Sequence, residues 1–97
     1  MIPSRDDFIL DHCDFSGGTD ETLDICRCYN FTYQWCTVTN GGPTGQAYGS
    51  LHGYAPLNNI SMHHNLWAHV AHRAPVVDFA VITGVSAYNV DLRNNII

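Results

Sequence analysis

Apolar and polar residues alternate in the same way in four segments of the chain. In each segment the first and third positions are apolar, whereas the second and fourth positions are mostly polar. A period of two is typical of β-strands that bury one face. The pattern therefore predicts four strands that lie parallel and in register, with starts separated by 23, 29 and 30 residues. The segments cover residues 8–15, 31–38, 60–67 and 90–97.

One column of the four segments holds only small or amide side chains. It lies five positions after the start of each segment and consists of Cys13, Cys36, Asn65 and Asn95. A stack of similar side chains at strand spacing is how a solenoid turns a corner, and an Asn in such a stack can hydrogen-bond to the residues above and below it. The column therefore predicts a stacked corner at the same place in every repeat.

Shorter apolar patches and turn residues recur between the four segments. The patches lie at 22–25, 50–52 and 76–79, and the loops contain glycines at 17–18 and a Gly- and Pro-rich run at 40–45. Each repeat thus holds at least two short strands and a loop. A repeat of this length is typical of one coil of a large parallel β-helix. The alternatives are a β-sandwich with accidental similarity and a leucine-rich repeat, whose leucine spacing the chain lacks.

The composition is that of a globular chain with the length of one small domain, 97 residues. Hydrophobic residues make up 45% of the chain and charged residues 13%. Four Arg and no Lys stand against nine acidic residues, so the formal net charge is −5. We expect no nucleic-acid partner, because nucleic acids are bound by basic surfaces. We expect no membrane span, because no run of 18 apolar residues occurs, and the N-terminal residues lack the apolar stretch of a signal peptide.

The cysteines and histidines do not show the spacing of a zinc site. Cys26 and Cys28 form a C-x-C pair, and no C-x-x-C pair follows it. We expect most of the four cysteines to be small buried residues, and a disulfide stays open as an alternative. His63 and His64 are adjacent on a predicted strand, so we expect them to point to opposite faces and not to bind one ion.

Several motifs occur in an order that resembles the pectate lyase family. They are Ile9-Leu-Asp-His12, the acidic pair Asp20 and Asp24, Phe31-Thr-Tyr-Gln-Trp35, His63-His-Asn65 and Arg73-Ala-Pro75. The resemblance covers most of residues 7–97 and implies an all-β fold, namely a segment of a right-handed parallel β-helix (solenoid). It also implies that residues 1–97 form a partial domain, truncated at both ends, whose adjacent coils are missing from this chain. A secreted or periplasmic location is implied in the same way.

The resemblance implies a polysaccharide lyase that cleaves polygalacturonate or a related uronate polymer by calcium-assisted β-elimination. Removal of the C5 proton of a uronate places charge on its carboxylate, and a divalent cation stabilises that charge. Ca²⁺ takes several oxygen ligands, and the matching acidic residues are Asp20, Asp24 and the adjacent Glu21. Apolar residues flank Asp24, so its side chain is expected to point out of the coil. Arg73 occupies the position of the family's catalytic base.

The chain departs from the family pattern on both sides of the Arg-x-Pro motif. The family commonly has a lysine in the preceding coil, where this chain has Gln46 or Tyr48, and the second family arginine would fall at Asp78. We therefore expect Gln46, Tyr48 and His72 to contact the acidic polysaccharide. We expect His52, as a second catalytic candidate, or His72 to help bind the substrate or to shuttle a proton.

Two other functions stay open at this point. One is a non-catalytic β-helix module that binds acidic carbohydrate, because a fold does not imply a function. The other is a glycosidase, which needs two carboxylates that flank the glycosidic bond. Asp20 and Asp24 could supply these carboxylates, but the Gly-His-Gly motif typical of polygalacturonase-type helices does not occur.

Overall fold

The strands of this protein form three sheets, and the computed structural model describes residues 2–3, 6–41, 48–53, 58–77 and 88–97. Within these residues the fold is all-β, with no helix. Sheet A consists of β1 (Ile2–Pro3), β4 (Glu21–Cys26), β7 (Tyr48–Gly53) and β10 (Val76–Val77), in this order. Sheet B consists, in order, of β11 (Tyr88–Arg93), β8 (Asn58–His63), β5 (Tyr29–Gln34) and β2 (Asp6–Asp11). Sheet C consists of β3 (Asp14–Ser16), β6 (Thr37–Thr39) and β9 (Leu66–Ala68).

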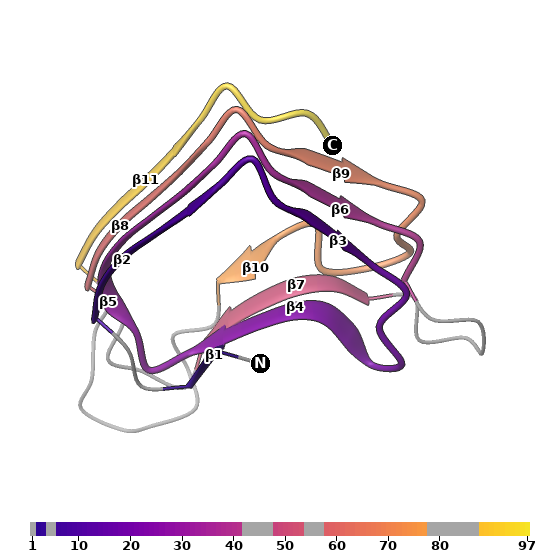
Figure 1. Ribbon diagram of the computed structural model, residues 1–97, viewed down its shortest axis with the longest axis horizontal. Helices are drawn as coiled ribbons and strands as arrows, with labels where there is room; N and C mark the ends of the chain where they lie inside the picture. Colours follow the sequence, from indigo (N-terminus) through magenta and orange to yellow (C-terminus); the bar gives the residue numbers. More distant parts are fainter. Residues whose placement is uncertain (1, 4–5, 42–47, 54–57, 78–87) are drawn as a thin grey trace.

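All strand pairs within the three sheets are parallel, and the chain visits the sheets in rotation. Figure 1 shows the result as nested bends, in which β2, β5 and β8 each run through a corner into a strand of sheet C, while sheet A lies across from them. In sheet B, Phe8 pairs with Phe31, Phe31 with Ile60, and Ile60 with Val90. The predicted parallel strands and their register are therefore confirmed.

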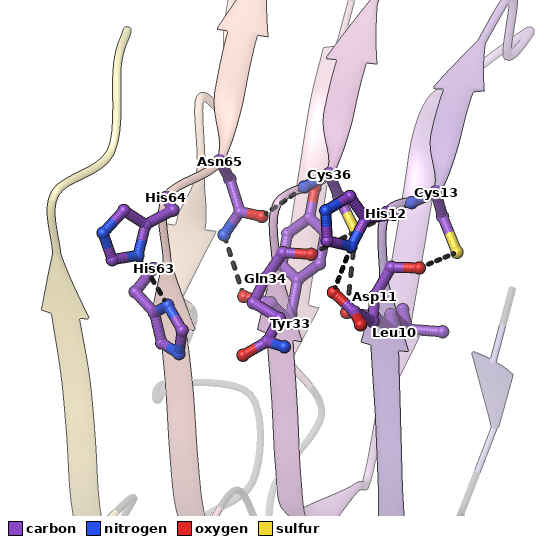
Figure 2. A network of polar contacts seen from close by, with 10 residues as sticks. All are labelled: Leu10, Asp11, His12, Cys13, Tyr33, Gln34, Cys36, His63, His64 and Asn65. Carbon is purple, nitrogen blue, oxygen red and sulfur yellow. Dashed lines mark hydrogen bonds and ion pairs between the residues drawn. The ribbon is translucent and has the colours of Figure 1, made fainter.

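The predicted corner stack of small and amide side chains is also confirmed. The Oδ1 atom of Asn65 accepts a hydrogen bond from the backbone N of Cys36 at 2.9 Å, and its Nδ2 atom donates to the carbonyl of Tyr33 at 2.9 Å. Asn95 makes the same two contacts in the next repeat. Its Oδ1 atom accepts a hydrogen bond from Asn65 N, and its Nδ2 atom donates to the carbonyl of Met62. Figure 2 shows how the amide of Asn65 bridges to the neighbouring strand. The side-chain amide of Asn65 thus satisfies the backbone N of Cys36 and the carbonyl of Tyr33, since buried backbone polar groups need a partner.

The residue that follows each strand of sheet B adopts a left-handed backbone conformation. The φ values are 53° at His12, 52° at Trp35, 56° at His64 and 52° at Asn94. This conformation turns the chain from sheet B into sheet C and interrupts the alternation of side chains at the corner. The expectation that His63 and His64 point to opposite faces is therefore wrong, since their Nδ1 atoms lie 2.8 Å apart.

The core lies between the sheets and is filled by the inward columns of the repeats. The rings of Phe8 and Phe31 stack at 5.0 Å, and the rings of Tyr33 and Trp67 meet edge to face at 5.7 Å. Trp67 also donates a hydrogen bond from Nε1 to the hydroxyl of Ser50 at 2.8 Å, which ties sheet C to sheet A. As expected, most of the cysteines are buried, namely Cys26, Cys28 and Cys36.

Replacement of Asn65 by alanine should lower the free energy of unfolding by about 2–6 kcal/mol, because two buried backbone groups lose their partners at about 1–3 kcal/mol each. The side chain of Asn65 is buried, with 2% of the residue exposed. The matched control is His69→Gly in the same coil, at an exposed position where φ is 56° and glycine is well tolerated. It should cost about 0.5 kcal/mol or less. Equal shifts of the urea midpoint for the two variants would contradict the role given to the buried amide.

Candidate functional site

Three of the residues expected at the site lie side by side at the start of the strands of sheet A. Glu21 on β4 pairs with Tyr48 on β7, and Tyr48 forms a parallel bridge with His72. The backbone continues this pairing, since the carbonyl of Arg73 accepts a hydrogen bond from Ser50 N at 2.7 Å. Successive turns of the chain thus bring one residue each to a common edge.

Arg73 connects these residues through its side chain. Its Nη1 atom forms an ion pair with Oε1 of Glu21, two strands away. The guanidinium carbon lies 4.2 Å from the ring centroid of Tyr48, and the ring of His72 meets that of Tyr48 edge to face at 5.8 Å. We call Glu21, Tyr48, His72 and Arg73 the Arg73 cluster. The guanidinium is held on one side by a charge and on the other by an aromatic face, and both contacts are attractive.

Burial differs between the two charges of the cluster. The side chain of Glu21 is 8% exposed, whereas that of Arg73 is 34% exposed and His72 is exposed. Along β4, the side chain of Glu21 lies on the same inward face as those of the buried residues Leu23 and Ile25, two and four positions later. The carboxylate is therefore screened from solvent by the cluster, and the guanidinium and imidazole form its accessible part.

Gly49 allows the close approach that the cluster requires. A Cβ atom at this position would lie 2.5 Å from the carbonyl oxygen of Arg73 and 3.2 Å from a ring carbon of Trp67. Both distances are shorter than a normal van der Waals contact, and the first involves backbone that cannot move aside locally. The glycine in the Tyr48-Gly-Ser50 segment is thus needed for the backbone of Arg73 to pair with β7.

The three acidic residues expected to hold Ca²⁺ do not converge. The carboxylate of Glu21 faces Arg73, as described above, and Asp20 is exposed just before β4. Asp24 lies on the outer face of β4, as expected, where its Oδ1 atom accepts a hydrogen bond from the thiol of Cys26 at 2.9 Å. Burial and the contact with Asp24 together raise the pKa of Cys26 to about 12, so this thiol keeps its proton and remains a donor.

A calcium centre needs several oxygen atoms within about 2.3–2.6 Å of one point. In the part of the chain that the structure describes, no group of three or more His, Cys, Asp or Glu side chains is close enough to hold a metal ion. Since Glu21 and Asp24 each have another partner, the donor set does not fit a single calcium ion in this arrangement. We therefore derive no catalytic step through calcium.

His52 lies in the core and not on the surface where a substrate would bind. It is 0% exposed, its Nε2 atom lies 3.2 Å from the hydroxyl of Ser50, and its ring packs 6.1 Å from that of Tyr33. Paired residues on neighbouring strands point to the same face of a sheet. His52 pairs with the inward residue Ile25, so its side chain also points into the core. The expectation that His52 binds substrate or moves a proton does not agree with this position. Gln46 and Asp78 lie outside the described residues.

The ion pair of Glu21 with Arg73 and the stacking on Tyr48 were not predicted from the sequence. One signal for them was present, because Glu21 and Tyr48 lie two residues before the buried Leu23 and Ser50. Counting back by two along each strand places both side chains at the inner edge of sheet A. Glu21 was instead grouped with Asp20 and Asp24, since acidic residues close in sequence suggest a shared ion.

The burial of His52 should make the stability of the fold depend on pH. Burial lowers the pKa of His52 to about 3, below the value of about 6.5 expected for an unfolded chain. The unfolded chain then binds more protons between these two values, so the free energy of unfolding should fall as the pH decreases through this window. The slope should be at most about 1.4 kcal/mol per pH unit for one proton.

Urea melts at several pH values test this prediction. His52→Leu should remove this part of the pH dependence, and His69→Asn, at an exposed position with a φ of 56°, should leave it unchanged. A slope that is the same in His52→Leu and in the original chain would show that His52 is not buried in its neutral form.

Comparisons with known proteins give no relative for this chain. No protein-family model, no curated protein and no solved structure matches it. Among the described residues, no helix is long and apolar enough to cross a membrane. The geometry of the Arg73 cluster is therefore the basis for assigning a function.

Proposed function

We propose that the chain is a segment of a right-handed parallel β-helix and that the Arg73 cluster is the active site of a polysaccharide lyase that resembles pectate lyases. The substrate is polygalacturonate or a related uronate polymer, cleaved by β-elimination. The rotation of the chain through three parallel sheets supports the β-helix. The observation that carries the proposed activity is the position of Arg73, whose guanidinium lies over Tyr48 and beside His72 at one edge of sheet A.

Arg73 is suited to bind the carboxylate of a uronate. A guanidinium has five N–H donors in a planar fork, and the ion pair with Glu21 uses Nη1. The remaining donors can form the paired hydrogen bonds that carboxylates prefer. The chain has a formal net charge of −5, so an anionic polymer is repelled overall and needs a local cation of this kind.

The elimination also needs a group that accepts the C5 proton. The base removes this proton, the electron pair forms the C4–C5 double bond, and the C4–O bond to the leaving sugar breaks, with water supplying the proton of the new hydroxyl. An arginine side chain stays protonated in proteins, so it is a poor base. Within the cluster, His72 carries an imidazole, the side chain that acts most often as a general base, and it is exposed.

We therefore assign carboxylate binding to Arg73 and proton removal to His72. Tyr48 contacts both side chains, so it positions the cation and the imidazole relative to each other. Developing negative charge on the substrate carboxylate would be stabilised by the guanidinium, which is already oriented by Glu21 and Tyr48. In this assignment the ion pair is part of the site, where Glu21 orients the guanidinium and also reduces its attraction for the substrate carboxylate.

A second candidate function is a non-catalytic module that binds acidic carbohydrate. The ion pair with Glu21 favours it, because a guanidinium that is already compensated binds an anion without providing much driving force for chemistry. The two functions differ in one product. A lyase releases unsaturated uronates that absorb in the ultraviolet, whereas a binding module releases none.

Incubation of the chain with de-esterified polygalacturonate should produce ultraviolet-absorbing unsaturated ends. His72→Asn should lower kcat by about 100-fold or more, the usual contribution of a general base, with little change in KM. Arg73→Lys should mainly raise KM, because an ammonium cannot reproduce the planar fork. His69→Asn and Arg93→Lys, on exposed positions outside the Arg73 cluster, are the matched controls and should keep full activity.

Three outcomes would count against these assignments. Binding of the polymer without any unsaturated product would favour the binding module over the lyase. Normal turnover of His72→Asn would remove His72 as the base. Loss of all activity in a calcium chelator would show that a metal, and not Arg73 alone, compensates the carboxylate.

Glu21→Gln provides a separate test of the ion pair. It removes the negative charge beside Arg73, so the guanidinium should bind the substrate carboxylate more tightly, and KM should fall several-fold. The same change should lower stability, because it leaves a partly buried cation without its partner. A higher KM in this variant would mean that Glu21 orients Arg73 more than it competes with the substrate.

A further inference from the structure

We propose that His63 and His64 form a binding site for a divalent transition-metal ion in tetragonal geometry, with Cu²⁺ preferred. This site is independent of the proposed lyase activity, because it lies where sheet B turns into sheet C, whereas the Arg73 cluster belongs to sheet A. The Nδ1 atoms of the two imidazoles lie 2.8 Å apart, and their rings are nearly perpendicular at 88°. Figure 2 shows both rings at the end of β8, with their Nδ1 atoms turned toward each other.

The separation of the two nitrogen atoms, which their hydrogen bond sets, also matches that of two neighbouring metal ligands at a right angle. Metal–imidazole bonds are about 2.0 Å long, so two ligands at a right angle place their nitrogens about 2.8 Å apart. A tetrahedral angle would separate them by about 3.3 Å. Right angles between neighbouring ligands are typical of square-planar or tetragonal Cu²⁺ and Ni²⁺ sites, and of these Cu²⁺ binds nitrogen ligands more strongly.

The backbone brings the two adjacent histidines to the same side. His63 is the last residue of β8, and His64 has a φ of 56°. In an uninterrupted strand the two side chains would point to opposite faces, so the left-handed residue is what makes the pair possible. Without a metal, one Nδ1 donates a hydrogen bond to the other, and a metal ion would take the place of this proton.

Neighbouring residues hold the ring of His64 in place. Its ring stacks on that of Trp35 at 4.2 Å with an angle of 19°, and its Nε2 atom lies 3.5 Å from the side-chain amide of Asn94. When Nδ1 binds a metal, Nε2 carries a proton and needs an acceptor, which the amide oxygen of Asn94 can provide after rotation. Such partners of the second ring nitrogen are a regular feature of histidine metal ligands.

Solvent can complete the coordination of the ion. Both histidines are half-buried, and His64 lines a surface cavity together with Trp35, Asn65, Asn94 and Ile96. Two protein ligands at right angles leave adjacent positions of a tetragonal ion open on the solvent side. Water molecules can occupy these positions. Two imidazoles are therefore sufficient to bind an ion at the surface and to fix the angle between two of its ligands.

Titration of the chain with Cu²⁺ tests the proposal, because a bound Cu²⁺ quenches the fluorescence of Trp35 stacked on His64. We expect one bound ion, with weaker binding of Zn²⁺, which prefers tetrahedral sites. His64→Asn keeps a residue that accepts a positive φ, and His63→Gln keeps the strand polar. Each should weaken Cu²⁺ binding by at least about tenfold. The matched control is His69→Asn, which also replaces a histidine with a φ of 56° in the same coil and should bind normally.

Electron paramagnetic resonance of the Cu²⁺ complex supplies the second readout, since two equivalent imidazole nitrogens should be present in the original chain and one in each variant. The proposal is wrong if His63→Gln and His64→Asn bind Cu²⁺ as tightly as the original chain, if His69→Asn abolishes binding, or if Zn²⁺ binds more tightly than Cu²⁺. Far-ultraviolet circular dichroism checks that each variant is folded. Should one of the two fail to fold, the other decides the result.

Discussion

The parallel hydrogen-bond ladder between successive strands determines which side chains can meet in this protein. Each strand pairs in register with a strand 23 to 30 residues away, so a column of side chains is built from one residue per repeat. At about 4.8 Å between neighbouring strands, two repeats span about 10 Å. This is within the reach of a long side chain such as that of Arg73, which contacts Glu21 across the intervening Tyr48. The candidate site is thus a consequence of register and not of local sequence.

Left-handed residues place the corners of this ladder, and most of them are residues that accept this conformation. At the second residue of each strand of sheet B, φ lies between 53° and 56°, and these residues are Asp7, Asn30, Asn59 and Asn89. Their side chains form a second ladder, in which Asn59 Nδ2 donates to Asn30 Oδ1 at 2.7 Å and Asn89 Nδ2 to Asn59 Oδ1 at 2.8 Å. A left-handed residue other than glycine costs about 1–2 kcal/mol, and hydrogen bonds between stacked amides offset part of this cost. The aromatic stack of Trp35 on His64 serves the corner to sheet C in a similar way.

The sequence predicted those features that depend on periodicity. Phe8, Phe31, Ile60 and Val90 were aligned because apolar residues recur at a fixed place in each repeat, and the Asn65 stack was found in the same way. The outward position of Asp24 followed from its apolar neighbours. The inward position of His52 was missed because its polar type suggested the surface, whereas the parity of its strand placed it in the core. Features that depend on the left-handed corners, such as the contact of His63 with His64, could not be read from alternation at all.

The Glu21–Arg73 ion pair links stability to the chemistry proposed for the site. The side chain of Glu21 is 8% exposed, so its charge is compensated mainly by Arg73, and removal of the guanidinium would leave a buried carboxylate unpaired at a cost of about 3–5 kcal/mol. For this reason a lysine at position 73 separates the two roles, because it keeps the compensating charge and removes only the planar arrangement of donors. In the proposed site, a uronate carboxylate that approaches Arg73 meets a cation whose orientation is fixed by Glu21 and Tyr48. The negative charge of Glu21 also reduces the attraction of this cation for the uronate. In the proposed function, the strength of substrate binding would therefore depend on how far the guanidinium can serve both anions at once, which its fork of donors allows and a point charge does not.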